Sequence, residues 1–298
     1  MASVQDYKRR IRSVRNTRKI TRAMELVAAA KLRRAQARIE AMRPYADTMR
    51  ELIAGVGRAA GSVRGLPLLQ QRETTAATLI VPLSGDRGLA GAFNAQVLRR
   101  AFALERQLQA EGQTVRWLGV GKKGRSTLSF RRRELDGAFV GFTDAPAYAD
   151  AQAIAHRAAE LFSSGEVDRV VLVYNRFVSA LVQKVTVSDL LPIPEEVLGG
   201  GEEMSAREEA LRGDFIYEPE PEEILQRLLP VYLETEIYRA LLESAASFLA
   251  SQMTAMRNAS KNAGELIDTY TLQMNRARQA QITQEILEIV AGADALTQ

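Results

Sequence analysis

The chain contains no cysteine and a single histidine, His156, among its 298 residues. Without thiols it cannot form a disulfide, use a thiol nucleophile or hold a Cys-ligated zinc ion, and one histidine cannot build a His-rich metal site. No apolar run approaches the roughly 18 residues that a bilayer span needs, and the amino terminus lacks the apolar core of a secretory signal. The composition fits a reducing compartment, and we expect no direct transmembrane span.

Acidic residues are scarce at the amino-terminal end. Residues 1–50 hold 14 Lys and Arg against 4 Asp and Glu, so a net charge of +10 is concentrated there although the whole chain carries only +4. An Arg-rich start resembles an organellar transit peptide, but its helical pattern continues for tens of residues, which indicates mature protein. Such a basic segment is either a solvated face or the binding surface for an anionic partner, which could be nucleic acid or an acidic protein surface.

Apolar positions recur at alternating spacings of four and three residues along this basic segment. The stripe consists of Met24, Ala28, Lys31, Ala35, Arg38, Met42, Tyr45, Met49, Leu52 and Val56. This spacing predicts a long helix with a coiled-coil seam, in which Lys31 and Arg38 are two basic interruptions. Pro44 is expected to bend the helix more than to end it, because the spacing resumes in register beyond it.

The carboxyl-terminal end repeats the pattern with fewer interruptions. Its seam consists of Leu249, Met253, Met256, Ser260, Ala263, Ile267, Tyr270, Met274 and Ala277. From about Glu222 to Ile289 the sequence predicts one helix of nearly seventy residues, roughly 100 Å long, with Pro230 as its expected kink. A helix of that length cannot be packed inside a globule of this size. We therefore expect the two terminal helices to cover each other's seams as an antiparallel pair.

The middle of the chain alternates strands with amphipathic helices, which predicts a mostly parallel sheet covered on both faces. Strands are expected over residues 78–85, 114–121, 168–177 and 180–193, the last two as a hairpin, and helices over 93–112 and 150–165. The predicted fold class is α/β, with a long antiparallel two-stranded coiled coil of the N- and C-terminal helices and an inserted, mostly parallel, Rossmann-like domain. The expected parts are a coiled-coil helix over 1–60, an α/β domain over 75–195, a linker over 196–220 and a coiled-coil helix over 221–298.

One glycine-rich stretch, residues 119–126, imitates a nucleotide-binding loop. Its glycines have the G-x-G-x-x-G spacing, and Asp136 follows at about the distance of a ribose contact. It also approaches a Walker A loop, but Arg125 stands where that loop needs lysine, and two lysines occupy the turn. We interpret the stretch as an ordinary connection between a strand and a helix.

Other chemically suggestive residues have simpler interpretations. His156 is expected to be solvated or locally bonded, and Trp117 to lie in the core. The acidic pairs Glu195–Glu196 and Glu222–Glu223 fall in a linker and at a helix start, without the convergent setting that tunes a catalytic acid and base. We therefore expect no catalytic site, no bound cofactor and no metal.

The two ends of the chain resemble the two ends of the γ subunit of F-type ATP synthases. The resemblance rests on residues 11–36 and 277–296. The family's carboxyl-terminal pattern is matched by Ile282, Thr283, Glu285, Glu288, Gly292, Ala293 and Ala295. Segments 84–94, 121–125 and 217–221 also resemble family segments in the same order. One departure is Ala90, where many relatives have cysteine.

This resemblance implies a rotor shaft. The coiled coil is implied to stand inside a hexamer of alternating catalytic and noncatalytic subunits, while its foot binds the ε subunit and the membrane ring of proton-carrying subunits. Rotation with the ring would couple proton flow to ATP synthesis or hydrolysis, with no nucleotide bound by this chain. The implied location is peripheral, on the cytoplasmic face of a bacterial cell membrane, since no cysteine-bearing regulatory insertion of the chloroplast type is present.

The resemblance, together with the cationic surface, also assigns candidate contact residues. Those expected at the catalytic subunits are Met24, Lys31, Arg33, Arg34, Arg38, Arg278, Gln279, Thr283 and Glu285. Those expected in the foot, at the ε subunit and the membrane ring, are Asp86, Arg87, Gly88, Tyr217 and Glu218.

Two other classes of protein are compatible with parts of this pattern. One is a free-standing α/β enzyme with a helical oligomerisation arm, which nucleotide binding by the isolated chain would support. The other is a basic coiled-coil nucleic-acid binder, which salt-dependent DNA binding would support. Few aromatic residues are available for base stacking, and the cations surround a seam instead of preceding a parallel zipper, so the sequence favours a protein partner.

Overall fold

The computed structural model describes residues 3–60, 65–72, 74–198 and 218–296. They form two compact units: residues 1–29 with 252–298, called the helical unit below, and residues 30–251, called the sheet unit. Helix α1 (Val4–Ala59) and helix α6 (Pro221–Leu296) contribute to both units. Most of the predicted linker over 196–220 lies outside the described residues, and its first residues belong to the 3-10 turn Glu195–Leu198.

Both terminal helices continue through their internal prolines. Pro44 lies inside α1 and Pro230 inside α6, as expected from patterns that resume in register on either side. At both positions the proline is exposed, so the loss of one backbone donor is compensated on the solvent side of the helix.

In the helical unit, α1 and α6 pack against each other in antiparallel directions. The Tyr7 and Tyr270 rings lie 6.5 Å apart, and Arg257 bonds to Glu25. From α6, Met256, Ala263 and Ile267 are buried. The side chains facing this seam from α1 are those of Ile11, Thr21, Glu25 and Ala28, which are also buried.

The predicted seam of α1 was wrong at every second position. Ala28, Ala35, Met42, Met49 and Val56 are buried or partly buried, but the positions between them are shifted by one residue. The exposed residues are Lys31, Arg38, Tyr45 and Leu52, and the seam instead passes through Leu32, Ile39, Ala46 and Ile53. From Ala28 the next buried position can lie three or four residues on, and both series repeat every seven residues. The helix that packs against α1 therefore decides which series is buried. The seam of α1 is therefore not interrupted by Lys31 and Arg38.

The sheet unit contains five strands in the order β3-β2-β1-β4-β5. The strands are β1 (Ala77–Pro82), β2 (Thr114–Val120), β3 (Gly137–Phe139), β4 (Arg169–Phe177) and β5 (Gln183–Leu191). The first four are parallel, and β4 pairs with β5 in an antiparallel hairpin, as predicted. The helices are α2 (Phe93–Ala110), α3 (Lys122–Phe130) and α4 (Tyr148–Ser163), with short 3-10 turns at Pro67–Leu69 and Glu195–Leu198.

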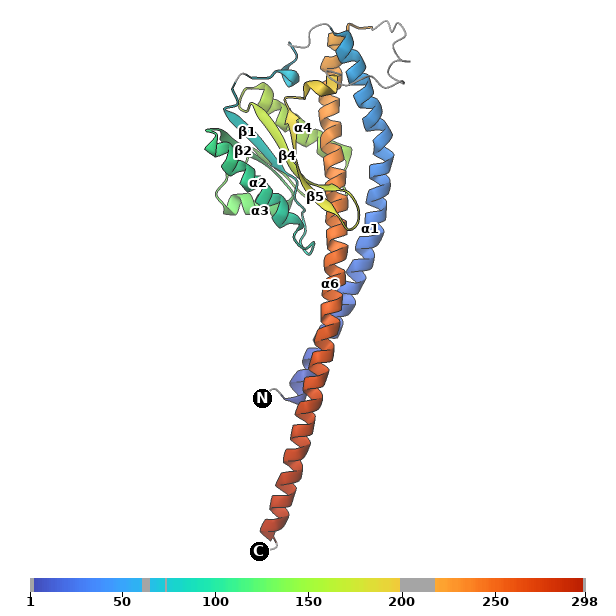
Figure 1. The fold of residues 1–298 in the computed structure, drawn as a ribbon, viewed down its shortest axis with the longest axis vertical. Helices are drawn as coiled ribbons and strands as arrows, with labels where there is room; N and C mark the ends of the chain where they lie inside the picture. The colour runs from blue at the N-terminus through green and yellow to red at the C-terminus, as the bar shows by residue number, and fades with distance from the viewer. Residues whose placement is uncertain (1–2, 61–64, 73, 199–217, 297–298) are drawn as a thin grey trace. The chain divides into compact units, whose positions relative to one another are not determined.

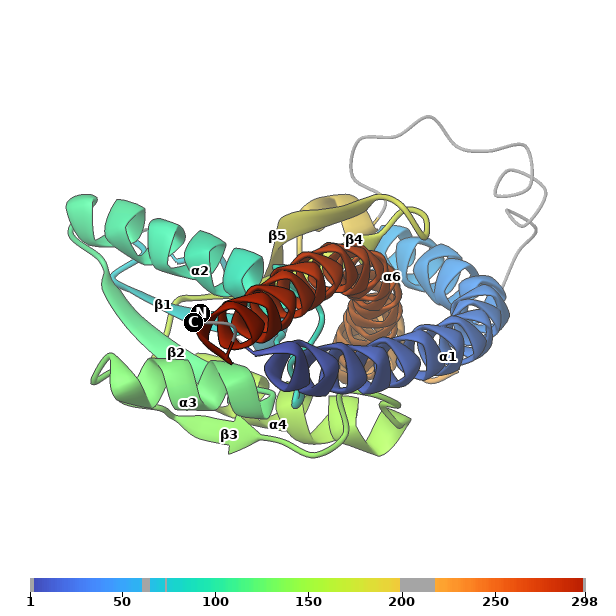
Figure 2. The same ribbon diagram turned by 90° about the horizontal axis from the view of Figure 1, so that it is seen from below.

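The two faces of the sheet are covered by different helices (Figures 1 and 2). On one face, α2 packs Phe102 and Leu104 against Trp117, which is buried as predicted. On the other face, α4 packs together with the parts of α1 and α6 in this unit, including Ile53 and Leu233. Residues 241–250 of α6 are all buried, because this stretch packs against its neighbours all round.

Two elements were missed from the sequence, the nine-residue helix α3 and the three-residue strand β3. Both are too short to show a helical or alternating period. Within the described ranges, no helix combines the length and apolar character that crossing a bilayer requires.

Candidate functional site

The α1 part of the helical unit is strongly basic. Residues 1–29 contain eight Lys and Arg but only two acids, Asp6 and Glu25, and both acids are paired within the unit. A groove of about 910 Å³ runs beside α1 and α6. It is lined by Arg15, Arg18, Lys19, Arg22, Ala23, Leu26, Ser260 and Ile267. Four cations and no acid line it, so it favours an anionic partner.

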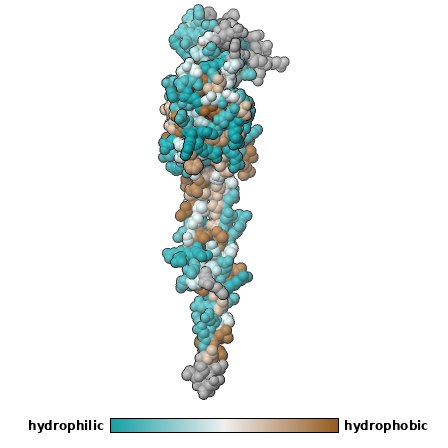
Figure 3. All heavy atoms as spheres, turned by 90° about the vertical axis from the view of Figure 1, so that its left-hand side faces the viewer, coloured by the Kyte–Doolittle hydropathy of each residue, from teal (hydrophilic) through white to brown (hydrophobic). Residues whose placement is uncertain are grey.

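Large apolar side chains are also exposed on this unit. Ile20, Leu26 and Val27 are 61%, 59% and 56% exposed. Apolar patches alternate with hydrophilic ones along the helices on the face shown in Figure 3. At the far end of α6, the exposed apolar side chains are Ile282, Ile286, Leu287, Ile289 and Val290. Large apolar side chains gathered on an exposed surface mark a surface that a partner covers.

The candidate contacts of the helical unit lie on this surface. Met24 is partly buried, while Arg278, Gln279, Thr283 and Glu285 are exposed. The hydroxyl of Thr283 donates to the carbonyl of Gln279 at 3.0 Å within the helix. Gln281 donates to the carboxylate of Glu285 at 2.9 Å.

The other candidate contacts of α1 belong to the sheet unit. Lys31, Arg33 and Arg34 are exposed. Arg38 is exposed too, but one of its nitrogens donates to the carbonyl of Pro146 at 2.9 Å. This guanidinium is thus partly engaged by its own chain, which leaves Lys31, Arg33 and Arg34 as the freer cations of this group.

The loop after β1 is organised by the carboxylate of Asp86. The backbone N–H groups of Lys122, Gly141 and Thr143 donate to it at 2.9–3.0 Å, and the Thr143 hydroxyl donates at 2.9 Å. Burial opposes ionisation, but these hydrogen bonds outweigh it and hold the pKa of Asp86 below its ordinary value. Asp86 therefore joins three loops at the carboxyl edge of the sheet.

This carboxylate fixes a loop whose next side chains face outwards. Arg87 is exposed and pairs with Asp144 at 3.3 Å. Leu89 is 63% exposed and has a φ of 62°, an uncommon conformation for a side chain of its size. Asn94 holds the loop from the side by accepting from Gly85 N–H and donating to the Arg87 carbonyl. The loop is a rigid platform that presents one cation and one apolar side chain.

The predicted foot residues lie in two places on the sheet unit. Gly85, next to Asp86, lies against Phe248 of α6, whose ring would be 3.1 Å from an added Cβ. Glu218 is exposed and precedes the start of α6 at Pro221. Phe248 and Pro221 are separated along one helix by roughly 40 Å at 1.5 Å per residue. Tyr217 lies outside the described residues. The predicted foot contacts therefore form two candidate surfaces.

The glycine-rich stretch connects β2 to α3. At the start of α3, Lys122 N–H donates to Asp86, Lys123 N–H to the Gly85 carbonyl, and Gly124 N–H to the hydroxyl of Ser84. The amide groups that would hold a phosphate are thus bonded to their own chain.

The remaining acids and His156 also have local explanations. Asp136, at the position of a ribose contact, pairs with Arg116, and His156 is exposed. Among the residues that the structure describes, no three His, Asp or Glu side chains are grouped to hold a metal ion.

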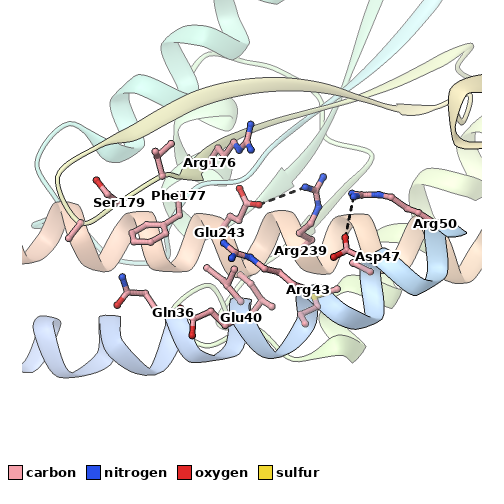
Figure 4. A pocket seen from close by; sticks show the side chains of 16 residues that line it. Gln36, Glu40, Arg43, Asp47, Arg50, Arg176, Phe177, Ser179, Arg239 and Glu243 are labelled. Carbon is pink, nitrogen blue, oxygen red and sulfur yellow. Dashed lines mark ion pairs between the residues drawn. The ribbon is translucent and has the colours of Figure 1, made fainter. Parts of the chain in front are cut away.

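A cavity of about 490 Å³ in the sheet unit has charged walls (Figure 4). It is lined by α1, the β4–β5 hairpin and α6. Arg50 pairs with Asp47 at 3.8 Å, and Arg239 with Glu243 at 3.9 Å. Burial raises the pKa of Glu243, against the opposing charge of Arg239. Opposite charges largely offset each other on its walls, so the cavity is polar without a strong charge of one sign.

Comparison with solved structures identifies the fold. The chain is similar to a chain of the central stalk and c-ring structure of the mitochondrial ATP synthase of Tetrahymena thermophila. The two are 30% identical with a TM-score of 0.58, over 81% of this chain and 99% of that one. A rotor chain of the Euglena gracilis mitochondrial ATP synthase gives a TM-score of 0.64 at 17% identity, over 94% of this chain and 98% of that one. Paired terminal helices with an inserted sheet are thus the fold of an ATP synthase central-stalk subunit.

Comparison with curated sequences gives the family. The family model of ATP synthase matches residues 3–296. An ATP synthase gamma chain of Rubrobacter xylanophilus is 48% identical over 99% of both chains, and one of Nostoc punctiforme is 45% identical over the full length of both. The chain belongs to the family of ATP synthase gamma chains.

Proposed function

We propose that this chain is the rotating shaft of a proton-translocating ATP synthase. This chain belongs to the gamma-chain family, and the observation that carries the proposal is its helical unit. The antiparallel helices of that unit expose cations and apolar side chains along their surface. A two-stranded coiled coil is stiff enough to transmit torque, which a single helix of this length is not. Rotation with the membrane ring would couple proton flow to ATP synthesis or hydrolysis.

The character of the surface suits a shaft that must bind and release repeatedly. Exposed ion pairs contribute only about 0–1 kcal/mol each, so contacts between Arg or Lys and acidic loops are weak individually. Ala23, Ala29 and Ala30 keep the surface of α1 low at their positions, which limits how deeply a neighbour can interlock with it there. Many weak contacts of this kind support a bearing surface inside a hexamer of catalytic and noncatalytic subunits.

The two surfaces of the sheet unit fit the remaining partners. The Asp86–Leu89 platform and the segment around Glu218 are the candidate contacts for the ε subunit, the membrane ring or the base of the hexamer. Because they are well separated along α6, we infer that they bind different partners. The chain would be peripheral, on the cytoplasmic face of a bacterial cell membrane, and would contribute no catalytic site of its own.

Reconstitution tests this function directly. We expect co-expression with cognate catalytic and noncatalytic subunits to give a complex that hydrolyses ATP and contains fewer copies of this chain than of either partner. The measurements are subunit ratio by quantitative mass spectrometry and ATP hydrolysis of the purified complex. The control is co-expression without this chain. Failure of any complex to form would reject the shaft, and nucleotide binding by the isolated chain would favour an enzyme.

A charge added to the shaft surface tests its contact with acidic loops. In Met24→Lys we expect the ratio of protons pumped to ATP hydrolysed to fall by about half or more, because a cation at this partly buried position strengthens one contact that must be released. The thermal midpoint should change by no more than about 2–4 °C. Met24→Leu is the control that keeps the size without the charge, and equal pumping ratios in the two variants would contradict the prediction.

A further inference from the structure

A carboxylate lies buried in the seam of the helical unit. Glu25 is 5% exposed, between Thr21 and Ala28 on the buried side of α1. Its Oε1 accepts from Arg257 Nε of α6 at 3.0 Å, and its Oε2 accepts from Arg22 Nη1 at 2.8 Å. Among the described residues of this unit, the Arg257–Glu25 contact is the hydrogen bond that joins the two helices.

The α6 stretch that follows Arg257 is lined by small residues. Ser260, Ala263 and Gly264 lie within two helical turns of Arg257. At Gly264 the guanidinium of Arg18 lies across the helix, with its carbon 3.6 Å from where a Cβ would stand. Coiled coils resist sliding through large side chains inserted between those of the partner. Ile11, Met256 and Ile267 supply part of that resistance in this unit, while the small residues near Arg257 add little to it.

Sliding of α6 along α1 in this unit would therefore be opposed by the charged pair in addition to these apolar side chains. A shift of one helical turn, about 5.4 Å, would separate Arg257 from Glu25. The carboxylate would then remain buried with only one of its two charged partners, and burying an incompletely paired charge is strongly unfavourable. Replacing the whole pair by apolar residues carries no such penalty, because apolar side chains pack in many registers.

We propose that Glu25 and Arg257 form an axial clamp, which keeps the two strands from sliding while torque is applied. This inference rests on the proposed shaft function, since sliding matters only under load. Glu25 is a positioning residue: it acts through Arg257 and touches no substrate. Glu25 pairs with a guanidinium at one position of α6. The pair therefore favours the one register of the seam that brings these two residues together.

The decisive variant is Glu25→Leu, which fills the seam without a charge. We expect a thermal unfolding midpoint equal to or above that of the original chain, because an apolar side chain suits this position. ATP hydrolysis by the reconstituted complex should stay within about twofold. Protons pumped per ATP against a high opposing proton gradient should fall roughly threefold, because the strands slide under load.

Two variants test whether the lost pumping reflects the clamp. Exchanging the charges in Glu25→Arg, Arg257→Glu, with Arg22→Gln to remove the cation that would otherwise repel the new arginine, should recover most of the pumping ratio. Thr21→Cys with Ser260→Cys, added to Glu25→Leu, should recover it on oxidation, because the chain has no other cysteine and a disulfide would replace the clamp. Lys261→Leu, which removes an exposed cation from the same helix, is the matched control and should pump normally.

Cross-linking in the full-length isolated chain separates the clamp from the shaft function. The Thr21→Cys, Ser260→Cys pair reports the native register, and Thr21→Cys, Ile267→Cys reports a slip of one heptad. Glu25→Leu should raise the second disulfide yield relative to the first by about fivefold. If Glu25→Leu changes neither the two disulfide yields nor the pumping ratio, the clamp is overturned. The clamp is also overturned if the variant loses pumping only in proportion to its loss of thermal stability. If the complex that contains the original chain does not pump at all, the shaft function is rejected, and cross-linking of the isolated chain still decides on the clamp.

Discussion

Gly121→Ala is expected to destabilise the sheet unit by about 4 kcal/mol or more, enough to unfold a domain of ordinary stability. Gly121 has a φ of +84°, and a Cβ there would lie 2.2 Å from the carbonyl oxygen of Ser84. That oxygen belongs to the backbone at the end of β1, so it cannot move without disturbing the carboxyl edge of the sheet. The measurement is urea unfolding followed by fluorescence of Trp117, the single tryptophan, which is buried in the adjacent strand.

Gly112→Ala separates the two causes of this effect. Gly112 has nearly the same φ, +83°, but no atom lies within 4 Å of its added Cβ. Its loss should be confined to the backbone strain of a left-handed residue, about 1–2 kcal/mol. Equal losses in the two variants would show that strain, and not contact with Ser84, controls this turn.

Asp86→Asn is expected to destabilise the sheet unit by about 2–4 kcal/mol, because it replaces a carboxylate that accepts four hydrogen bonds. An amide has one acceptor oxygen, and its NH₂ group would face backbone donors. The loop that carries Arg87 and Leu89 should become sensitive to limited proteolysis. Asp268→Asn, at an exposed position, is the control and should change the free energy of unfolding by less than about 0.5 kcal/mol.

The same carboxylate predicts the direction of acid sensitivity. The folded-state pKa of Asp86 lies below its unfolded value, so its contribution is fully present above the unfolded pKa, near 4. It is lost as the pH falls through the folded pKa. Between neutral pH and about pH 2, the original chain should therefore lose more stability than Asp86→Asn. A parallel pH dependence of the two free energies of unfolding would contradict this assignment.

The order of the elements was predictable because the relevant patterns are local. Strands and helices long enough to show a period were placed within a few residues, and both terminal helices were expected to continue through Pro44 and Pro230. Helix α3 and strand β3 were missed because neither extends over enough residues to show one. The glycine-rich stretch was correctly interpreted as a turn, because two lysines and Arg125 do not suit a phosphate loop.

The seam shows where local pattern stops being sufficient. Lys31 and Arg38 lie one residue before Leu32 and Ile39, and either series satisfies a heptad. The same limit applies to the predicted foot: Asp86 and Glu218 are far apart in sequence, and no short-range pattern reports whether the chain brings them together. Nor did the sequence indicate that Glu25 would be buried, because its partner Arg257 comes from the opposite end of the chain.

The sequence alone determined the family, the absence of thiol chemistry, the basic amino-terminal end and the presence of two long helices around an α/β segment. These follow from composition, period and motif, which are properties of neighbouring residues. Only the tertiary structure decided which face of α1 is buried, that Asp86 joins three loops, and that the Glu25 carboxylate links the two helices of the helical unit. Each of these depends on contacts between residues distant in the chain, and burial and pairing energies arise only when such residues meet.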